Sequence, residues 1–290
     1  MVRSYDIRWA FTWLFVIFVN VYCYKPVVII HGLFDKPENL EYLASYISKK
    51  HSRTNVTVIN LYDGLKSLSP LWEQIHEFGN SVSKIMKENP NGIHMIGYSQ
   101  GGLIARGIIS TLDNHNVNTF ISLSSPQMGQ YGDTDIIKVW FRDLIKKYAY
   151  KFFYTNEGQL ISIGNFWNDP HHHDIFLNKS IFLPYLNNEI NHKQNLNYKK
   201  NFMRLKKLIL IGGPDDGVIC PWQSSQFGFY TKNEDILPME KQWVYKIDAF
   251  GLRTLSERNA TKILTMAGID HYQWHKNQTI FDNFILPYLD

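Results

Sequence analysis

Cysteine is scarce in this sequence, with two residues among 290. Cys23 lies at the end of an apolar N-terminal run, and Cys220 follows far along the chain. If the N-terminal run is removed, Cys220 has no intramolecular partner, so we expect the mature protein to fold without an internal disulfide. A chain of this length can instead bury a large core, and 44% of its residues are hydrophobic.

The sequence also lacks an excess of charge of one sign. Charged residues make up 19% of the chain, the formal net charge is +4, and the short basic pairs are not joined into a stripe. This pattern excludes the basic surface that a nucleic acid requires, so no nucleic-acid partner is expected. No fixed-period repeat and no low-complexity tract is visible, which indicates an ordinary packed fold.

Long hydrophobic runs are missing except at the N-terminus. Arg3 and Arg8 precede an apolar run from Trp9 to Tyr22, the arrangement of a secretory signal peptide. The run is short and its far side uncharged, so we expect residues 1–23 to be cleaved, leaving no stable membrane span; an uncleaved anchor is the alternative. Entry into the secretory pathway would make four sequons candidates for glycosylation. They begin at Asn55, Asn178, Asn259 and Asn277.

Short apolar runs alternate with segments of helical periodicity. Strands are expected at residues 27–30, 56–61, 93–98, 120–123 and 207–211, and helices at 37–50, 71–87, 101–112 and about 281–289. This alternation predicts an α/β fold with a mostly parallel sheet and helices on both faces. We expect one domain over residues 24–290. An aromatic-rich insertion at about 126–205 interrupts the alternation and is expected to form a cap over the carboxyl edge of the sheet.

The pentapeptide Gly97-Tyr98-Ser99-Gln100-Gly101 has the form G-x-S-x-G and stands between a predicted strand and a predicted helix. In this context the serine lies on a sharp turn, and glycines on both sides avoid collisions with the neighbouring backbone. A chance Gly/Ser turn is the alternative interpretation. The context predicts the α/β-hydrolase fold with Ser99 as nucleophile.

A serine hydroxyl needs a general base and an acid, which follow in the order Ser, Asp, His in this fold. Asp216 follows the strand at 207–211 and is the preferred acid, whereas Asp215 is assigned to turn stabilisation. His271 is placed on a loop before the last helix and is the preferred base, with His275 as its rival.

The remaining parts of the site are predicted from position. The backbone N–H groups of Leu33 and Gln100 are the expected oxyanion donors, because Leu33 follows the first strand and Gln100 follows the nucleophile. Aromatic residues of the insertion are either core or the wall of an acyl groove. They are Trp140, Phe152, Phe153, Phe166 and Trp167. The run His171-His172-His173-Asp174 is interpreted as a polar loop rather than a metal site, and no cofactor is expected.

Four stretches around these residues carry a resemblance to a known family. They are Leu71–Gln74, Tyr98–Leu103, Ser124–Gly129 and Phe227–Tyr230. Together they resemble the palmitoyl-protein thioesterase family, and residues 121–133, 168–172 and 211–225 look like its second lysosomal branch. The resemblance runs from about Lys25 to the C-terminus. It implies a lysosomal enzyme, reached through the secretory pathway with secretion as a further destination, that hydrolyses long-chain acyl thioesters of cysteine-containing peptides or coenzyme A.

Two other functions stay open at the level of sequence. The same three residues serve an oxygen esterase or lipase equally well, because the triad does not select the leaving heteroatom. A catalytically silent lipid-binding protein on a hydrolase fold is the alternative from a different class. The sequence does not determine the acyl-chain length, the thiol partner or the oligomeric state.

Overall fold

A computed structural model of the chain describes residues 24–52, 54–132 and 146–290. Its centre is a six-stranded sheet in the order β2-β1-β3-β4-β5-β8, and each neighbouring pair is parallel. The strands are β1 Val27–Ile30, β2 Val56–Val58, β3 Ile93–Tyr98, β4 Val117–Leu123, β5 Lys207–Gly212 and β8 Thr261–Thr265. Because all six run the same way, their carboxyl ends meet at one edge of the sheet.

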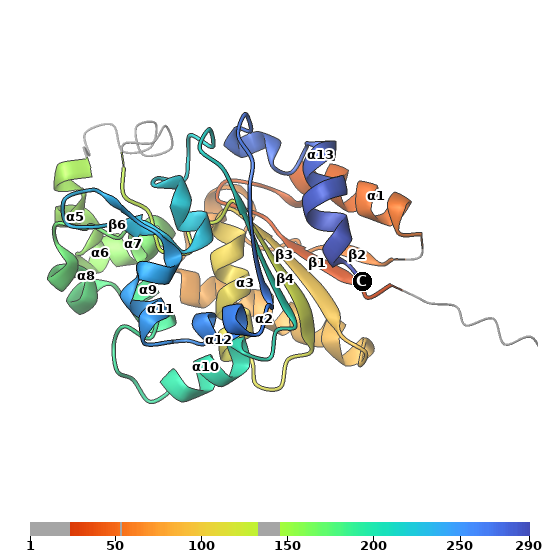
Figure 1. Cartoon of the computed structure of the whole chain (residues 1–290), viewed down its shortest axis with the longest axis horizontal. Coiled ribbons are helices and arrows are strands. Elements are labelled where there is room, and N and C mark those ends of the chain that lie inside the picture. The colour runs from red at the N-terminus through yellow and green to blue at the C-terminus, as the bar shows by residue number, and fades with distance from the viewer. Residues whose placement is uncertain (1–23, 53, 133–145) are drawn as a thin grey trace, which may run out of the picture.

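Helices cover both faces of this sheet (Figure 1). On one face lie α1 (Glu41–Lys50) and the C-terminal helical segment, which joins α13 (Gln278–Ile280), a π-helical turn (Phe281–Ile285) and a 3₁₀ turn (Leu286–Tyr288). On the other lie α2 (Leu71–Glu88) and α3 (Gln100–Thr111). Adjacent strand residues divide between the two faces: in β1, Val27 joins one hydrophobic cluster and Val28 the other. The α/β fold predicted from the alternating pattern is confirmed.

The described part of the insertion contains short helices that pack on the α2/α3 side of the sheet (Figure 1). They are α5 Lys146–Phe153, α6 Asn156–Gln159, α7 Ser162–Phe166, α8 His173–Lys179, α9 Leu183–Leu186 and α10 Asn195–Phe202. Side chains such as Phe153, Trp167 and Phe202 belong to the same hydrophobic cluster as β1 and α3. Within the described residues, the insertion therefore shares its core with the sheet.

The segment between β5 and β8 contains small elements. They are the 3₁₀ turns Trp222–Gln226 and Met239–Lys241, the strands β6 Phe229–Tyr230 and β7 Ile236–Leu237, and the helices α11 Trp243–Lys246 and α12 Leu252–Glu257. β6 and β7 pair in an antiparallel ribbon apart from the main sheet. Two further 3₁₀ turns, Pro37–Leu40 and Gly64–Leu68, lead into α1 and α2.

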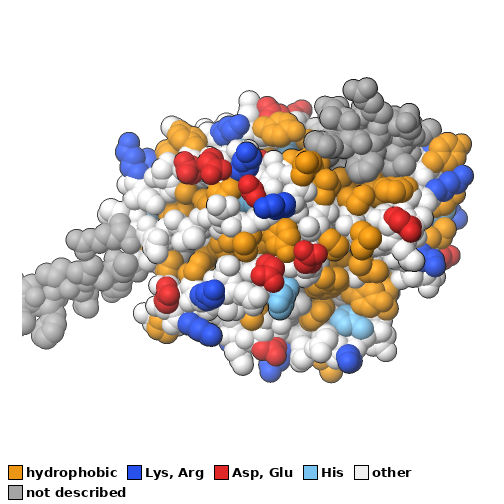
Figure 2. Space-filling view, turned by 180° about the vertical axis from the view of Figure 1, so that it is seen from behind, with side chains coloured by type: hydrophobic (Ala, Val, Ile, Leu, Met, Phe, Trp, Pro, Cys, Tyr) orange, Lys and Arg blue, Asp and Glu red, His pale blue; other side chains and the backbone are white. Residues whose placement is uncertain are grey.

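Charges of both signs are interspersed over the described surface seen in Figure 2, between patches of hydrophobic side chains. This matches the even spread of charge along the sequence. Among the described residues, none of the helices is both long and apolar enough to cross a membrane. The predicted signal peptide at 1–23, including Cys23, lies outside the described residues.

Candidate active site

Ser99 stands at the turn between β3 and α3, at the carboxyl edge of the sheet. Its backbone has φ of +54°, a conformation that non-glycine residues rarely adopt. The side chain is nearly buried, with 8% exposure. The turn therefore holds this one hydroxyl in a fixed, sheltered position at the end of a central strand.

The glycines around Ser99 are required by close backbone approach. A Cβ on Gly97 would lie 2.5 Å from the Gly101 carbonyl oxygen, and a Cβ on Gly101 would lie 2.3 Å from the Ile30 carbonyl oxygen. Real Cβ atoms do not reach such distances, so any side chain at these positions forces the strand and helix apart. The two glycines of the G-x-S-x-G pattern are therefore required for α3 to pack directly against β3 and β1.

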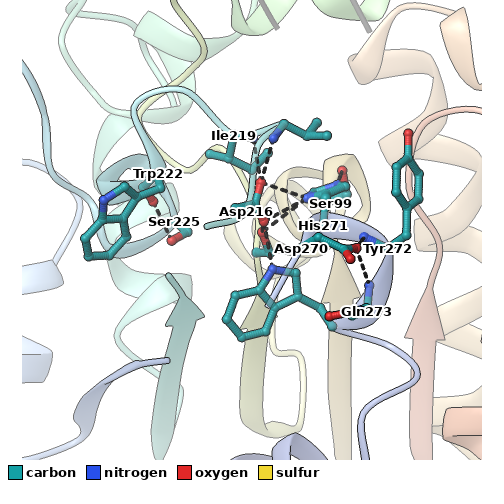
Figure 3. Close-up of polar contacts among 12 residues, drawn as sticks. Ser99, Asp216, Ile219, Trp222, Ser225, Asp270, His271, Tyr272 and Gln273 are labelled. Carbon is teal, nitrogen blue, oxygen red and sulfur yellow. Dashed lines mark hydrogen bonds and ion pairs between the residues drawn. The ribbon is translucent and has the colours of Figure 1, made fainter. Parts of the chain in front are cut away.

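His271 lies in the 3₁₀ turn His271–Gln273, after β8, and its imidazole lies between Ser99 and Asp216 (Figure 3). Its Nε2 atom is 2.9 Å from the Ser99 hydroxyl oxygen. Its backbone is fixed on two sides, because the His271 N–H donates to the Asp216 carbonyl and the Tyr98 hydroxyl donates to the His271 carbonyl. The imidazole is buried, with 3% exposure, and it is positioned to accept the serine proton.

Asp216 follows β5 and contacts the far side of the same imidazole, with its carboxylate oxygens 3.0 and 2.9 Å from His271 Nδ1. The carboxylate also accepts hydrogen bonds from the backbone N–H groups of Val218 and Ile219. Burial by itself raises the pKa of Asp216, but the neighbouring His271 and the Ile219 and Ser124 donors outweigh burial and lower the pKa below its usual value. The group is therefore held as a carboxylate.

Two donors to Asp216 were not predicted from the sequence. The Ser124 hydroxyl donates to Oδ2, and the Trp274 indole N–H donates to the same oxygen at 2.7 Å. Ser124 follows the end of β4, and Trp274 lies three residues beyond His271. For Ser124 the available signals were its position directly after a strand of a parallel sheet and its place in the family-like stretch Ser124–Gly129. Trp274, which follows a 3₁₀ turn, carried no such signal.

The sequence alternatives for the acid and the base lie elsewhere. Asp215 is exposed and accepts the Gly268 N–H at 2.7 Å, a contact between two loops. His275 is buried against the ring of Tyr98, and its Nδ1 atom has no hydrogen-bond partner among the residues that the structure describes. The geometry brings together Ser99, His271 and Asp216.

The two expected oxyanion donors flank Ser99. Gln100 is the first residue of α3, so its backbone N–H belongs to the group of amides that have no partner within the helix. Leu33 follows Gly32, where an added Cβ would lie 2.9 Å from Ser99 Cβ. Gly32 thus lets the backbone of the Leu33 loop approach the nucleophile closely.

The aromatic residues of the insertion lie largely in the core. Phe153, Phe166 and Trp167 are buried in the cluster shared with the sheet, and Phe152 packs partly buried against it. Trp140 lies outside the described residues. An acyl groove lined by these side chains remains a prediction.

The histidine run contacts separate partners. His171 Nε2 is 2.9 Å from Glu234, and His172 Nδ1 is 3.0 Å from Asp169. No group of three or more potential metal ligands occurs within the described part of the chain. Of the sequon asparagines, Asn55, Asn178 and Asn259 are exposed, whereas Asn277 is half-buried and caps α13 through its side chain.

Comparison with known proteins identifies the relatives of this chain. Residues 26–271 match the family model described as palmitoyl protein thioesterase. The chain is 53% identical over 266 residues to the Mus musculus protein named lysosomal thioesterase PPT2, covering 92% of this chain and 88% of that protein. It is 42% identical over 267 residues to the Drosophila melanogaster protein named lysosomal thioesterase PPT2 homolog, covering 92% of each.

Among solved structures, the propeptide form of the Bacillus licheniformis lipase BlEst2 has the same fold, with a TM-score of 0.52 at 14% identity. The match covers 92% of this chain and 50% of the lipase. That likeness confirms the α/β-hydrolase fold. Since the family model spans most of the chain and the named relatives are similar over nearly their whole length, the chain belongs to the palmitoyl protein thioesterase family.

Proposed function

We propose that this protein is a lysosomal thioesterase that hydrolyses long-chain, palmitoyl-type acyl thioesters of cysteine-containing peptides, proteins or coenzyme A. The observation that carries the proposal is one continuous chain of contacts, from the Ser99 hydroxyl through His271 to Asp216. The relatives are named lysosomal thioesterases, and these names supply the substrate class and the compartment.

In the proposed mechanism, Ser99 Oγ attacks the acyl carbonyl carbon while His271 Nε2 takes the hydroxyl proton. The carbonyl electron pair moves onto oxygen, and the resulting anion accepts hydrogen bonds from the backbone N–H groups of Leu33 and Gln100. Collapse of this intermediate breaks the carbon–sulfur bond, the departing sulfur takes the proton from the His271 imidazolium, and an acyl ester remains on Ser99 beside a neutral imidazole. His271 then takes a proton from water as the water oxygen attacks that ester. Collapse of the second tetrahedral intermediate breaks the carbon–oxygen bond to Ser99, whose oxygen takes the proton back from His271, and the fatty acid is freed.

The leaving group determines what the imidazolium must do. A cysteine-like thiol has a pKa of about 8.5, so it departs as thiolate with less proton donation than an alkoxide requires. Asp216 orients the imidazole and stabilises its protonated form, and its lowered pKa keeps it ionised in an acidic compartment. The arrangement therefore suits cleavage of a thioester, whose leaving group needs little proton donation.

Matched substrates test the proposal against oxygen-ester hydrolysis. We expect the purified protein to hydrolyse palmitoyl thioesters with a higher kcat/KM than oxygen esters of the same chain length, and Ser99→Ala to abolish both activities. A fluorophosphonate probe should label the unchanged protein and not the variant. Faster oxygen-ester turnover would identify a lipase or esterase, and absence of labelling would favour a silent lipid-binding protein.

The proposed route to the lysosome passes through the secretory pathway by way of the predicted signal peptide at 1–23. Exposed sequon asparagines at Asn55, Asn178 and Asn259 support glycosylation along this route. We expect glycosidase treatment of the expressed protein to reduce its apparent mass, and the N-terminus of the mature protein to lie near residue 24. An unmodified protein that retains Met1 would contradict the proposed route.

A further inference from the structure

Ser67 lies in the 3₁₀ turn Gly64–Leu68, between β2 and α2, and is 1% exposed. Its hydroxyl accepts a hydrogen bond from the Phe34 backbone N–H at 2.8 Å and donates to the Gly64 carbonyl at 2.6 Å. Phe34 directly follows Leu33, the first proposed oxyanion donor. The Ser67 hydroxyl thus holds the peptide unit next to that donor.

The backbone carbonyl of Ser67 contacts the other side of the site. It accepts hydrogen bonds from Gln100 Nε2 at 2.8 Å, from Gln74 Nε2 at 2.9 Å and from the Ser162 hydroxyl at 3.1 Å. The Gln100 side chain is buried, and the backbone N–H of the same residue is the second proposed oxyanion donor. One residue therefore connects to the segments that carry both donors.

The Leu33 loop needs such a restraint because its backbone conformation is unfavourable. Phe34 has φ of +61°, which costs a non-glycine residue free energy and is retained only where the surroundings enforce it. Oxyanion stabilisation in turn depends on donors fixed at hydrogen-bond distance from the developing charge, so a small shift of either amide lowers the rate. The Ser67 hydroxyl lies where it prevents that shift.

We propose that Ser67 is a positioning residue of the oxyanion hole: its hydroxyl fixes the Leu33–Phe34 backbone, and its carbonyl fixes Gln100. This inference rests on the proposed function only for the assignment of Leu33 and Gln100 as donors. It assigns to Ser67 no contact with substrate. Ser67 therefore affects the step in which negative charge develops on the acyl oxygen, and it does not affect binding of the acyl chain.

The test compares Ser67→Ala with the unchanged protein. We expect kcat to fall about tenfold and KM to stay within about twofold, because ground-state binding is intact. A palmitoyl trifluoromethyl ketone adds to Ser99 and places an anionic oxygen in the hole, so its inhibition constant should rise by about the same factor as kcat falls. The dissociation constant of palmitate, which forms no oxyanion, should not change.

Ser162→Ala is the matched control. It deletes another fully buried serine hydroxyl that bonds to Ser67, but it leaves the Phe34 contact and two of the donors to the Ser67 carbonyl in place. We expect kcat and the ketone inhibition constant of this variant to match those of the unchanged protein. Gln100→Leu breaks the Ser67 connection from the other side and keeps the backbone N–H, so it should reproduce the Ser67→Ala pattern and replaces that variant if Ser67→Ala does not fold.

Unchanged kcat and ketone affinity in a folded Ser67→Ala or Gln100→Leu protein would overturn the inference. So would a parallel loss of palmitate and ketone affinity, which indicates general distortion of the pocket. Each readout is a ratio between a variant and the unchanged protein, and it is measured with whichever acyl ester the protein hydrolyses. A failure of the thioesterase proposal, seen as preference for oxygen esters, is therefore distinguishable from a failure of this one.

Discussion

Asp216 is a buried carboxylate whose oxygens accept several hydrogen bonds at once. His271, Trp274 and Ser124 contact it through side chains, and Val218 and Ile219 through backbone N–H groups. A buried charge is stable only when its hydrogen-bonding capacity is filled, and here that capacity also fixes the direction of the carboxylate. The donors therefore determine both the charge of Asp216 and the orientation it imposes on His271.

Replacing Asp216 by Asn should lower kcat by about 10³- to 10⁴-fold, because the amide supports the wrong imidazole tautomer and does not stabilise the imidazolium. Steady-state hydrolysis of an acyl thioester measures the effect. Asp215→Asn is the control, since it removes an adjacent exposed carboxylate that contacts only the Gly268 N–H among the hydrogen bonds described. An equal loss in both variants would refute the assignment of Asp216.

Removing the Ser124 hydroxyl should shift the pH dependence of the reaction. This hydroxyl helps to lower the pKa of Asp216, so Ser124→Ala should raise that pKa toward its usual value or above it. The ionised carboxylate stabilises the imidazolium that forms when His271 takes the serine proton, and this support is lost as the pH falls through the pKa of Asp216. At the acidic limb of the kcat profile, Ser124→Ala should therefore lose activity at a higher pH than the unchanged protein. A profile of kcat against pH between 3 and 8 tests this.

Ser125→Ala provides the comparison for that profile, because Ser125 is equally buried but its hydroxyl accepts from Gln127 instead. Its acidic limb should coincide with that of the unchanged protein. If the acidic limb of the kcat profile of Ser124→Ala does not move, the remaining donors are sufficient to keep the pKa of Asp216 low.

At the scale of single residues, the sequence identified those site residues that a local motif or a position after a strand marks. Ser99 was identified by its flanking glycines, and Asp216 and His271 by their places after strands; the structure brings all three into contact. Ser124, Trp274 and Ser67 were not identified. Their contacts with Asp216, Phe34 and Gln100 join residues distant in the sequence, and a single serine or tryptophan in a turn or loop carries no pattern of its own until the fold is known.

At the scale of elements, the distance between α3 and the strands β3 and β1 determines where Ser99 lies. Gly97 of β3 faces the start of α3, and Gly101 and Gly102 of α3 face the end of β1 and the loop after β4, all at distances that exclude a Cβ. Close packing carries the helix start, and with it the Gln100 N–H, directly to the end of the central strand. The pentapeptide is therefore a packing requirement as much as a catalytic one.

Gly101→Ala should destabilise the protein by more than about 2 kcal/mol, because the new methyl group overlaps the carbonyl oxygens of Ile30 and His31 and the backbone must move. Gly79→Ala in α2 is the matched helical control. Its added Cβ would have its nearest neighbour, in Ile108, at 3.9 Å, so it should stabilise by about 0.5–1 kcal/mol. Chemical denaturation measures the change in the free energy of unfolding for both variants. An unchanged free energy of unfolding in Gly101→Ala would contradict the packing argument.

Elements with a strong apolar signal were predicted within a few residues. β1 and β3 coincide with the predicted strands, and α2 differs from its predicted helix by one residue. β8 was not located, because this edge strand, Thr261–Thr265, is mostly exposed and partly polar. The two-residue strands β6 and β7 and the short insertion helices also have too few residues to establish a period.

At the scale of the whole molecule, a buried polar chain links the insertion to the helix that follows the nucleophile. Arg106 of α3 donates to the Gln127 carbonyl at 2.9 Å and to the side chain of Asn187. Asn187 in turn donates to Glu189 at 2.7 Å, and the Arg106 guanidinium lies over the rings of Phe227 and Phe250. Burial lowers the pKa of Arg106 to about 9, which leaves it a cation at physiological pH.

Glu189, at the end of that chain, should make the fold more stable in acid. Its side chain is 10% exposed, and burial raises its pKa to about 7 although Asn187 and Arg106 act in the opposite direction. The other titratable neighbour is His173, whose Nε2 is 4.0 Å from the carboxyl group and whose own pKa is lowered by burial. Because the carboxyl group binds its proton more tightly in the folded state than in the unfolded state, it contributes stability below its unfolded pKa of 4.5 that is lost as the pH rises through about 7.

We therefore expect the melting temperature to fall between pH 5 and pH 8, and Glu189→Gln to flatten this decline by several degrees, because glutamine remains neutral throughout. Thermal unfolding at a series of pH values measures the difference. Glu257→Gln removes the same charge from a side chain that is 68% exposed and should leave the slope unchanged. A Glu189→Gln variant with the original slope would place the pH sensitivity in other groups, whereas the expected result would assign that sensitivity to the burial of the Glu189 charge.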